Sequence, residues 1–246
     1  MNIFSQLVAW FTDPAQWSGS GGIPVRVAQH VEYSAAAAAA ALVLALPVGI
    51  GVGHFNRGGL LAINIANIGR AIPSLGLLVL MFFLVGFGFL PAFVALVALA
   101  IPPIVTNSYT GMRSVDPEVR ESAIGMGMTR WQRLWQVEIP VAMPLILAGV
   151  RTSVVQVVAT TTLAAFIGLG GLGRYLIDGL SQQDYPQVIG GAILVALLAI
   201  IVEFLMGLLQ KLLVPRGIAS RNATGSTKDA RKPALAVTTI DEGNTL

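Results

Sequence analysis

Residues 121–140 read ESAIGMGMTRWQRLWQVEIP and form a polar island in an otherwise apolar chain. Charged side chains, glycines and two tryptophans lie within this short stretch, which ends at Pro140. Gly127 near its centre is suited to the left-handed conformation that follows a helix end. The stretch therefore predicts a folded segment with a bend, and not a plain linker.

Helix-capping signals lie on both sides of Gly127. The preceding residues 116–118 read Asp-Pro-Glu, in which Asp caps a helix, Pro is tolerated at its first position and an acid lies in its first turn. Residues 129–132 fit a capping box that starts a second helix. We expect the first helix to run to about Met126 and the second to carry Trp131 and end before Pro140.

The rest of the chain has the composition of a membrane protein. Of its 246 residues 55% are hydrophobic and 11% are charged, whereas soluble domains contain about 25% charged residues. A helix crosses the hydrocarbon core with about 20 apolar residues. The apolar runs predict an all-α membrane protein with five spans, at 33–53, near 60–85, near 89–112, at 141–166 and at 188–212.

Lysine and arginine are unevenly distributed between the predicted connections. One side receives Arg57, the loop 113–140 and the segment after residue 210, which are rich in these residues, whereas the other side has only Arg26 and Arg174. The positive-inside rule then puts the loop and the C-terminus in the cytoplasm and the N-terminus outside.

The two ends differ from the spans. Residues 1–32 contain Trp10, Phe11 and Trp17 and are predicted to lie at the outer membrane interface, without a cleaved signal peptide. Residues 218–246 are rich in Ser, Thr, Asn, Asp and Lys and are predicted to be a disordered cytoplasmic tail. The spans between them make up one domain, 33–217.

Small residues are concentrated in the first span. Seven alanines occupy 35–41, and Gly49-x-x-x-Gly53 follows them. Small residues allow helices to approach closely. We interpret them as packing residues.

The polar island carries a family resemblance. Glu121-Ser122-Ala123, three residues, Gly127, nine residues and then Val137-x-Ile139-Pro140 resembles the EAA loop of ABC-importer permeases, with Ser in place of the middle Ala. The runs at 67–78, 166–173 and 211–217 look most like permeases for glycine betaine, carnitine and choline.

The resemblance implies a function for the loop. In such importers the short helices are coupling helices that dock in a groove of a cytoplasmic ATPase subunit, which binds the ATP. Carried over to this chain, the docking residues are Glu121, Ser122, Ala123, Gly127 and Pro140. The implied partners are that ATPase, a second permease subunit, identical or not, and an external substrate-binding protein, in a bilayer and without nucleic acid.

Three alternatives stay open at this point. The loop can be an amphipathic connector that lies flat on the bilayer with its tryptophans among the headgroups. The chain can be a permease of the same type for another solute, such as methionine. It can also be a secondary transporter or channel that works alone, although few ionisable residues are available for ion coupling.

Two polar stripes inside the spans are candidates for the substrate path. Each falls on one helical face, and polar stripes in lipid face protein or water. The alternative is hydrogen bonding that only holds helices together. The residues are Asn64, Asn67, Arg70 and Ser74 in the second span and Ser153, Gln156 and Thr160 in the fourth.

Three charges lie deep in the predicted spans, at Arg70, Arg151 and Glu203. Each is about ten residues, or about 15 Å, from the cytoplasmic end of its span. An unpaired charge at that depth is costly, so a structural ion pair is expected. His30 and His54 lie at span ends and are interpreted as incidental.

Enzymatic motifs are not supported. Gly168-x-Gly170-x-x-Gly173 matches a dinucleotide fingerprint, but no strand–turn–helix unit surrounds it, so a tight turn at the outer end of the fourth span is expected. The sequence has no cysteine, no metalloprotease helix and no nucleophile–base set. We predict a protein that is not an enzyme and that has no catalytic residues, metal site or cofactor of its own.

Overall fold

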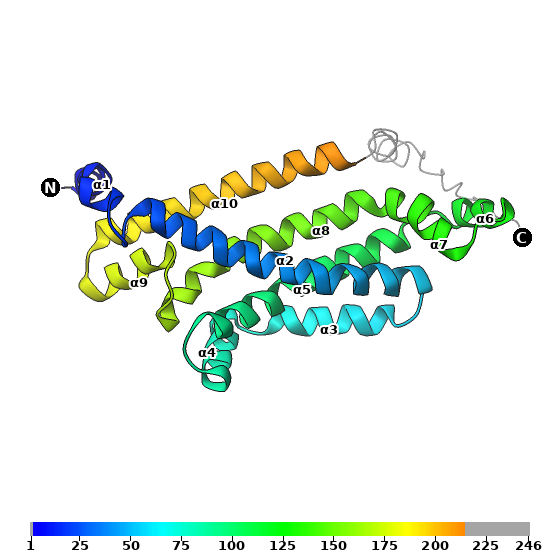
Figure 1. Ribbon diagram of the computed structural model, residues 1–246, viewed down its shortest axis with the longest axis horizontal. Helices are drawn as coiled ribbons and strands as arrows, with labels where there is room; N and C mark the ends of the chain where they lie inside the picture. The colour runs from blue at the N-terminus through cyan, green and yellow to red at the C-terminus, as the bar shows by residue number, and fades with distance from the viewer. Residues whose placement is uncertain (1, 215–246) are drawn as a thin grey trace, which may run out of the picture.

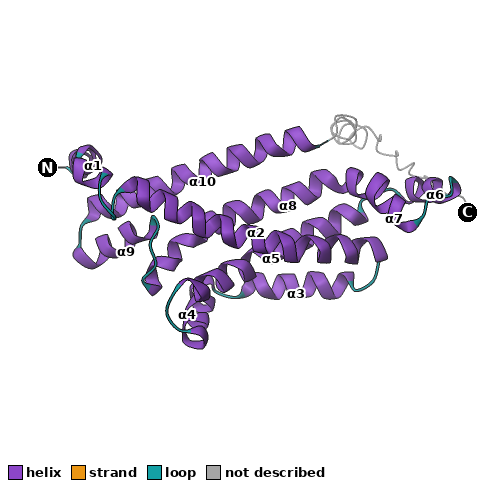
Figure 2. Ribbon diagram, in the orientation of Figure 1, coloured by secondary structure: helices purple, strands orange, loops and turns teal. Residues whose placement is uncertain are grey.

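The fold is an elongated helical bundle in a computed structural model that describes residues 2–214. All the regular structure in these residues is helical, with loops between the helices (Figure 2). The predicted tail, 218–246, lies outside the described residues. The helices are α1 (Ile3–Thr12), η1 (Pro14–Trp17), α2 (Ile23–Phe55), α3 (Gly59–Ala71), α4 (Ser74–Val85), α5 (Phe89–Arg113), α6 (Pro117–Gly125), α7 (Arg130–Arg133), the π turn η2 (Leu134–Glu138), α8 (Ile139–Thr160), the 3-10 turn η3 (Thr161–Ile167), α9 (Gly173–Gln182) and α10 (Tyr185–Leu213).

The predicted spans correspond to helices of the bundle. Within the described residues four helical segments are long and apolar enough to cross a membrane: α2, α5, the continuous segment Arg130–Ile167 and α10. The second predicted span is not straight, because α3 and α4 meet at an angle of 89°. The bend falls at Ile72-Pro73, where proline lacks the donor that a continuous helix requires and disfavours helical backbone before it. Counted as one broken span, the pair makes five crossings, as predicted.

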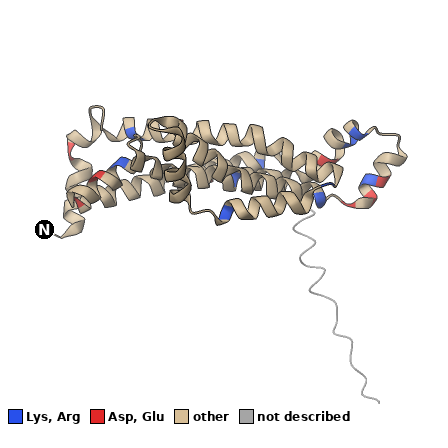
Figure 3. Ribbon diagram, turned by 90° about the horizontal axis from the view of Figure 1, so that it is seen from below, with Lys and Arg blue, Asp and Glu red and all other residues tan. Residues whose placement is uncertain are grey.

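The first spanning helix is longer than its apolar run. That run begins at Tyr33, whereas α2 begins ten residues earlier, at Ile23. The added turns include charged residues at the end of the bundle where α1 and α9 lie (Figure 1). Lys, Arg, Asp and Glu are concentrated toward the two ends of the bundle (Figure 3).

The bundle core lies where α2, α5 and α8 meet. Ala37 and Ala41 of α2 are fully buried, against Ala100 of α5 and Val157 of α8. A β-carbon on Gly49 would lie 2.7 Å from the Ser108 β-carbon, so glycine is needed for this close approach. Small side chains therefore pack α2 onto its neighbours, as predicted from the alanine run and the glycine pair.

The glycine-rich stretch after η3 is a tight turn. Gly168 and Gly171 have positive φ angles of 86° and 87°, which glycine adopts at little cost. Gln29 of α2 accepts a hydrogen bond from the Gly171 amide at 2.9 Å. Within the described residues no strand precedes this turn, in agreement with a turn and not a dinucleotide site.

His30 beside this turn is not incidental. It is completely buried, its Nε2 lies 2.8 Å from the Val158 carbonyl oxygen, and its Nδ1 accepts from the Leu172 amide at 3.3 Å. The side chain therefore joins α2 to the end of α8 and to the start of α9. Sequence reasoning missed it because both partners are more than 120 residues away in the chain.

Candidate functional site

The loop between α5 and α8 begins with the capped helix α6. Asp116 Oδ1 accepts from the Glu118 amide at 2.9 Å, and Pro117 is the first helical residue. The helix ends at Gly125, and Gly127 follows with φ of 79°. These features confirm the predicted start and stop. The constraint at Gly127 is conformational, since no atom of the chain would lie within 4 Å of an added β-carbon; an internal clash is not the reason for the glycine.

The predicted capping box opens α7. The Gln132 amide donates to Thr129 Oγ1 at 3.3 Å, and the Thr129 amide donates to Gln132 Oε1 at 2.9 Å. Reciprocal bonding of this kind satisfies donors at the start of a helix that otherwise lack partners. The bend at Gly127 is therefore fixed on the α6 side by backbone bonds from the Gly127 and Met128 amides and on the α7 side by the capping box.

The expectation that the second helix ends before Pro140 is wrong. The chain stays helical from Arg130 to Ile167. The Ile139 amide bonds back to the Leu134 carbonyl through the π turn η2, and Pro140 then lies at the start of α8. Proline is tolerated at the start of a helix, and a π turn changes the local register, so no break is required. The second short helix is thus the first part of the fourth span.

The docking residues proposed from the motif divide into two groups. Glu121, Ser122 and Gly127 are exposed, whereas Ala123 is buried and Pro140 is half-buried. The exposed residues are available to a partner, whereas Ala123 is not. Ala123 instead packs α6 against its neighbours, and Pro140 lies at the start of α8.

An exposed apolar surface on the same loop was not assigned to docking from the sequence. The Trp131 and Trp135 rings pack edge to face with centroids 5.6 Å apart. Their residue exposures are 67% and 54%, and those of Ile124 and Met126 are 55% and 71%. Exposed aromatic and methionine side chains are enriched at protein interfaces. The tryptophans in a polar segment were the signal for this surface.

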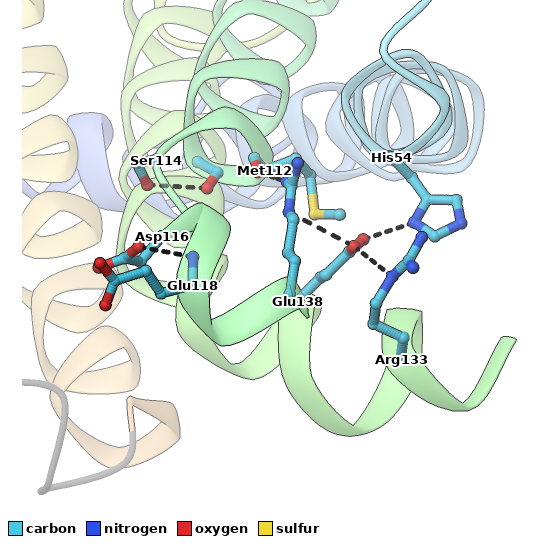
Figure 4. Close-up of polar contacts among 9 residues, drawn as sticks. His54, Met112, Ser114, Asp116, Glu118, Arg133 and Glu138 are labelled. Atoms are coloured by element: carbon cyan, nitrogen blue, oxygen red, sulfur yellow. Dashed lines mark hydrogen bonds and ion pairs between the residues drawn. The ribbon is translucent and has the colours of Figure 1, made fainter. Parts of the chain in front are cut away.

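A buried charge cluster lies directly behind the loop. Glu138, within the motif's Val-x-Ile-Pro, is 0% exposed. Its carboxylate accepts from Arg133 Nε at 3.0 Å and also pairs with His54 at the end of α2 (Figure 4). The interpretation of His54 as incidental is therefore wrong. Glu138 stands between apolar residues at the start of a span, and this position was the available signal for a buried charge. Its partner His54 is 84 residues away in the chain.

The residues of the two predicted polar stripes lie in several different environments. Asn64, Asn67 and Arg70 share an exposed face of α3. Ser74 and Thr160 line one small pocket between α4, α5 and η3, and Gln156 is half-buried.

Ser153 has a different environment from the other path candidates. Its hydroxyl is fully buried and donates to the Ala100 carbonyl at 2.8 Å. This contact is the interhelical hydrogen bonding that we considered as the alternative. It joins α8 to α5.

Two of the three deep charges pair. Arg151 of α8 donates to Glu203 of α10 at 2.8 Å, as equal depth predicted. Arg70 forms no salt bridge to any residue in the described range 2–214. It remains with Asn64 and Asn67 on the uncovered face of α3.

These features define a multi-pass helical membrane protein with a structured loop at one end of its bundle. Residues 41–217 match the family described as "Binding-protein-dependent transport system inner membrane component", and the chain belongs to this family. It is therefore a transport permease subunit and not an enzyme. Membership implies an ATPase partner and a binding protein.

Three relatives are named as transport permeases for small solutes. The chain is 41% identical to the glycine betaine/carnitine/choline transport system permease protein OpuCB of Bacillus subtilis, over 66% of this chain and 75% of the relative. It is 42% identical to the choline transport system permease protein OpuBB of the same organism, over 63% and 72%. It is also 43% identical to the osmoprotectant import permease protein OsmW of Salmonella typhimurium, over 63% and 75%.

A solved structure shares the fold. The inward-facing MetNI methionine ABC transporter superposes with a TM-score of 0.68 at 23% identity, covering 83% of this chain and 100% of that chain. At this identity the likeness concerns the fold. The predicted fold class, that of an ABC-importer permease, is confirmed.

Proposed function

We propose that this chain is the translocating subunit of an ATP-driven importer for quaternary-ammonium compatible solutes such as glycine betaine, carnitine and choline. The observation that carries the proposal is the identity of 41% and 42% to permeases named for glycine betaine, carnitine and choline or for choline alone. A third relative, 43% identical, is named for osmoprotectants. ATP is bound by the partner ATPase, so this chain uses no cofactor of its own.

The loop Pro117–Arg133 is the proposed docking site for the ATPase. Its exposed parts combine the carboxylate of Glu121 with the apolar surface around Trp131. A capped helix with a fixed bend moves as a rigid body, and such bodies transmit displacement between subunits. This supports docking over the alternative of a connector lying flat on the bilayer, which requires no fixed bend.

The proposed orientation follows from charge. Arg57, the docking loop and Lys211 lie toward one end of the bundle, and we place that end in the cytoplasm with the N-terminus outside. The external binding protein then delivers solute at the end formed by α1, α9 and the glycine-rich turn.

A second permease subunit completes the proposed path. The polar face of α3, with Asn64, Asn67 and Arg70, has no cover within the described residues. A polar face in lipid is costly unless protein or water meets it. We place this face against the second subunit or the solute path between the two subunits, with Ser74, Gln156 and Thr160 at the side of that path and Ser153 in the packing between helices.

Reconstitution of the purified chain in liposomes tests the proposal. With the ATPase inside, the binding protein outside and ATP present, radiolabelled glycine betaine or choline accumulates. Methionine supplied with the same components does not accumulate; methionine uptake in its place would support the alternative solute. Uptake by the chain alone, driven by an ion gradient, would support a stand-alone carrier and contradict the proposal.

A further inference from the structure

One buried carboxylate receives nitrogen partners from three parts of the chain. Glu138 Oε1 accepts from Arg133 Nε at 3.0 Å and lies 3.5 Å from Arg120 Nε. Its other oxygen pairs with His54 Nδ1. Figure 4 shows the side chains of His54 and Arg133 directed at the Glu138 carboxylate, near Met112 at the end of α5.

The cluster is shielded from solvent. The side chains of Glu138 and His54 are 1% and 4% exposed, and those of Arg120 and Arg133 are 18% and 16% exposed. Burial penalises charge, so a buried carboxylate requires these partners. Apolar residues pack beside it, since Met112, Leu134 and Ile139 belong to one buried cluster. Apolar side chains can fill such a space at no cost in stability, so filling space is not a sufficient reason for the charges.

The partners differ in what they join. Arg133 lies on the same continuous helix as Glu138 and orients the carboxylate. His54 belongs to the last turn of α2, and Arg120 belongs to α6. The Arg120 guanidinium also donates to the Met112 carbonyl at the end of α5. One carboxylate therefore contacts α2 and α6 directly, and α5 through Arg120.

The α6 helix has few other attachments to the bundle. Ala123 is its only buried residue. The Arg120–Glu138 contact is also the longest in the cluster, with 3.5 Å between Arg120 Nε and Glu138 Oε1. Arg120 Nε has no hydrogen-bond acceptor in this conformation. A buried donor without an acceptor is unfavourable. At a separation of 3.5 Å this contact is sensitive to the position of α6 relative to α8.

We infer that Glu138 is a positioning residue that transmits displacement of α6 to α2 and α8. The inference rests on the proposed function, in which α6 docks on the ATPase. It adds a residue outside the docking surface and a route: from α6 through Arg120 to Glu138, and from Glu138 through His54 to α2. A directional polar network holds relative orientation more strictly than apolar contacts do.

The test uses the full complex of permease, ATPase and binding protein. In Glu138→Gln the shape stays and the charge is lost. We expect the complex to assemble and basal ATP hydrolysis to persist, while the stimulation by solute-loaded binding protein falls by about 5- to 150-fold, the usual range of coupling between sites. Glu138→Asp keeps the charge and should recover part of the stimulation.

A second variant distinguishes loss of coupling from loss of folding. Arg120→Gln removes the link from α6 to Glu138 and the hydrogen bond to the Met112 carbonyl. It changes a partly exposed side chain and leaves Glu138 paired with His54 and Arg133, so the bundle should remain folded. It should reduce stimulation as Glu138→Gln does, and the double variant should be no worse than either single one, because interacting residues are not additive. Additive effects, or equal loss of basal and stimulated hydrolysis with a lower thermal midpoint, would show a role in stability only.

The proposed function and the transmitting role of Glu138 can be refuted separately. If the unaltered chain shows no ATP-dependent uptake with its partners, the proposed function is wrong whatever Glu138 does. If the unaltered complex is stimulated and Glu138→Gln and Arg120→Gln are stimulated equally well, the proposed function stands and the transmitting role of Glu138 is refuted.

Discussion

Arg151 Nε donates a hydrogen bond to Glu203 Oε1 at 2.8 Å and joins α8 to α10. The only buried residues of α10 are Gly190 and Gly191 in its first two turns. Farther along the helix, Gln210 Nε2 donates to the Pro144 carbonyl at 3.1 Å. Two polar contacts therefore attach the later part of α10 to the bundle, and the ion pair is the charged one.

Breaking this ion pair should loosen α10. We expect Glu203→Gln to lower the thermal midpoint of the purified protein, because the arginine loses its anionic partner in a span. Exchange of both charges, in Arg151→Glu with Glu203→Arg, should recover part of the loss. Thermal unfolding in detergent measures the effect. Equal midpoints for the single variant and the unaltered protein would show that the pair does not hold α10.

Sequence reasoning succeeded where a structural signal is local. The caps at Asp116 and Thr129 could be predicted because each side chain bonds to an amide only two or three residues away. Recognising such a cap requires no knowledge of the fold. Sequence reasoning also found that Arg70, Arg151 and Glu203 lie at one depth where an ion pair is possible, because depth in a span can be counted along the chain, but it did not identify which arginine pairs with Glu203. Arg70, at the same depth, does not join that pair, because α3 lies on another side of the bundle.

Other features depend on contacts that sequence spacing does not contain. Glu138 meets His54 only because α2 packs on α5 beside the start of α8. The α3–α4 bend had a local signal in Pro73, but the apolar run across it favoured one straight span. Pro140 was misinterpreted as a helix end because the π turn before it leaves no clear pattern in the residue types.

Gly53 should tolerate no side chain. A β-carbon there would overlap the Met112 side chain of α5, so Gly53→Val should lower the free energy of unfolding by about 1–3 kcal/mol. Gly51 is the matched control, since an added β-carbon would have no neighbour within 4 Å. Gly51→Ala should be neutral or stabilise the protein by about 0.4–1 kcal/mol. Denaturant or thermal unfolding in detergent measures both, and equal effects would contradict the close approach of α2 and α5.

Gly127 should be sensitive to backbone conformation and not to size. Its φ of 79° costs other residues about 1–2 kcal/mol, whereas asparagine adopts this region more readily. We expect the amount of ATPase that co-purifies to fall in the order Gly127, Gly127→Asn, Gly127→Ala, with a loss of up to about tenfold for alanine. Gly125→Ala lies in the helical part of the same loop and should have no such effect. If Gly127→Ala retained as much ATPase as the unaltered protein, the bend would not be required for docking.

The orientation of the chain can be measured without transport. Alkaline phosphatase is active only outside the cytoplasm, so a fusion after Leu180, in α9, should be active. A fusion after Arg216 should be inactive, because α10 returns the chain to the other side. The reverse pattern would place the docking loop outside and contradict both the orientation and the role of the loop.

The position of Glu121 makes energy coupling testable. Its side chain is exposed on α6, and it forms no salt bridge within residues 2–214. It is therefore available to a basic residue of a partner. Because it lies outside the apolar spans, its substitution should not disturb insertion.

Glu121→Lys should leave the protein folded but uncouple it from the ATPase. A charge-assisted hydrogen bond contributes about 1.5–3 kcal/mol, and reversing the charge adds repulsion. Occupancy of the complex should then fall at least about tenfold, at about 1.4 kcal/mol per decade. Glu118→Lys makes the same charge change on α6 and should have a smaller effect. Reversing the facing basic residue of the ATPase should restore some solute-stimulated ATP hydrolysis. Normal uptake by Glu121→Lys without any ATPase would instead identify a carrier that works alone.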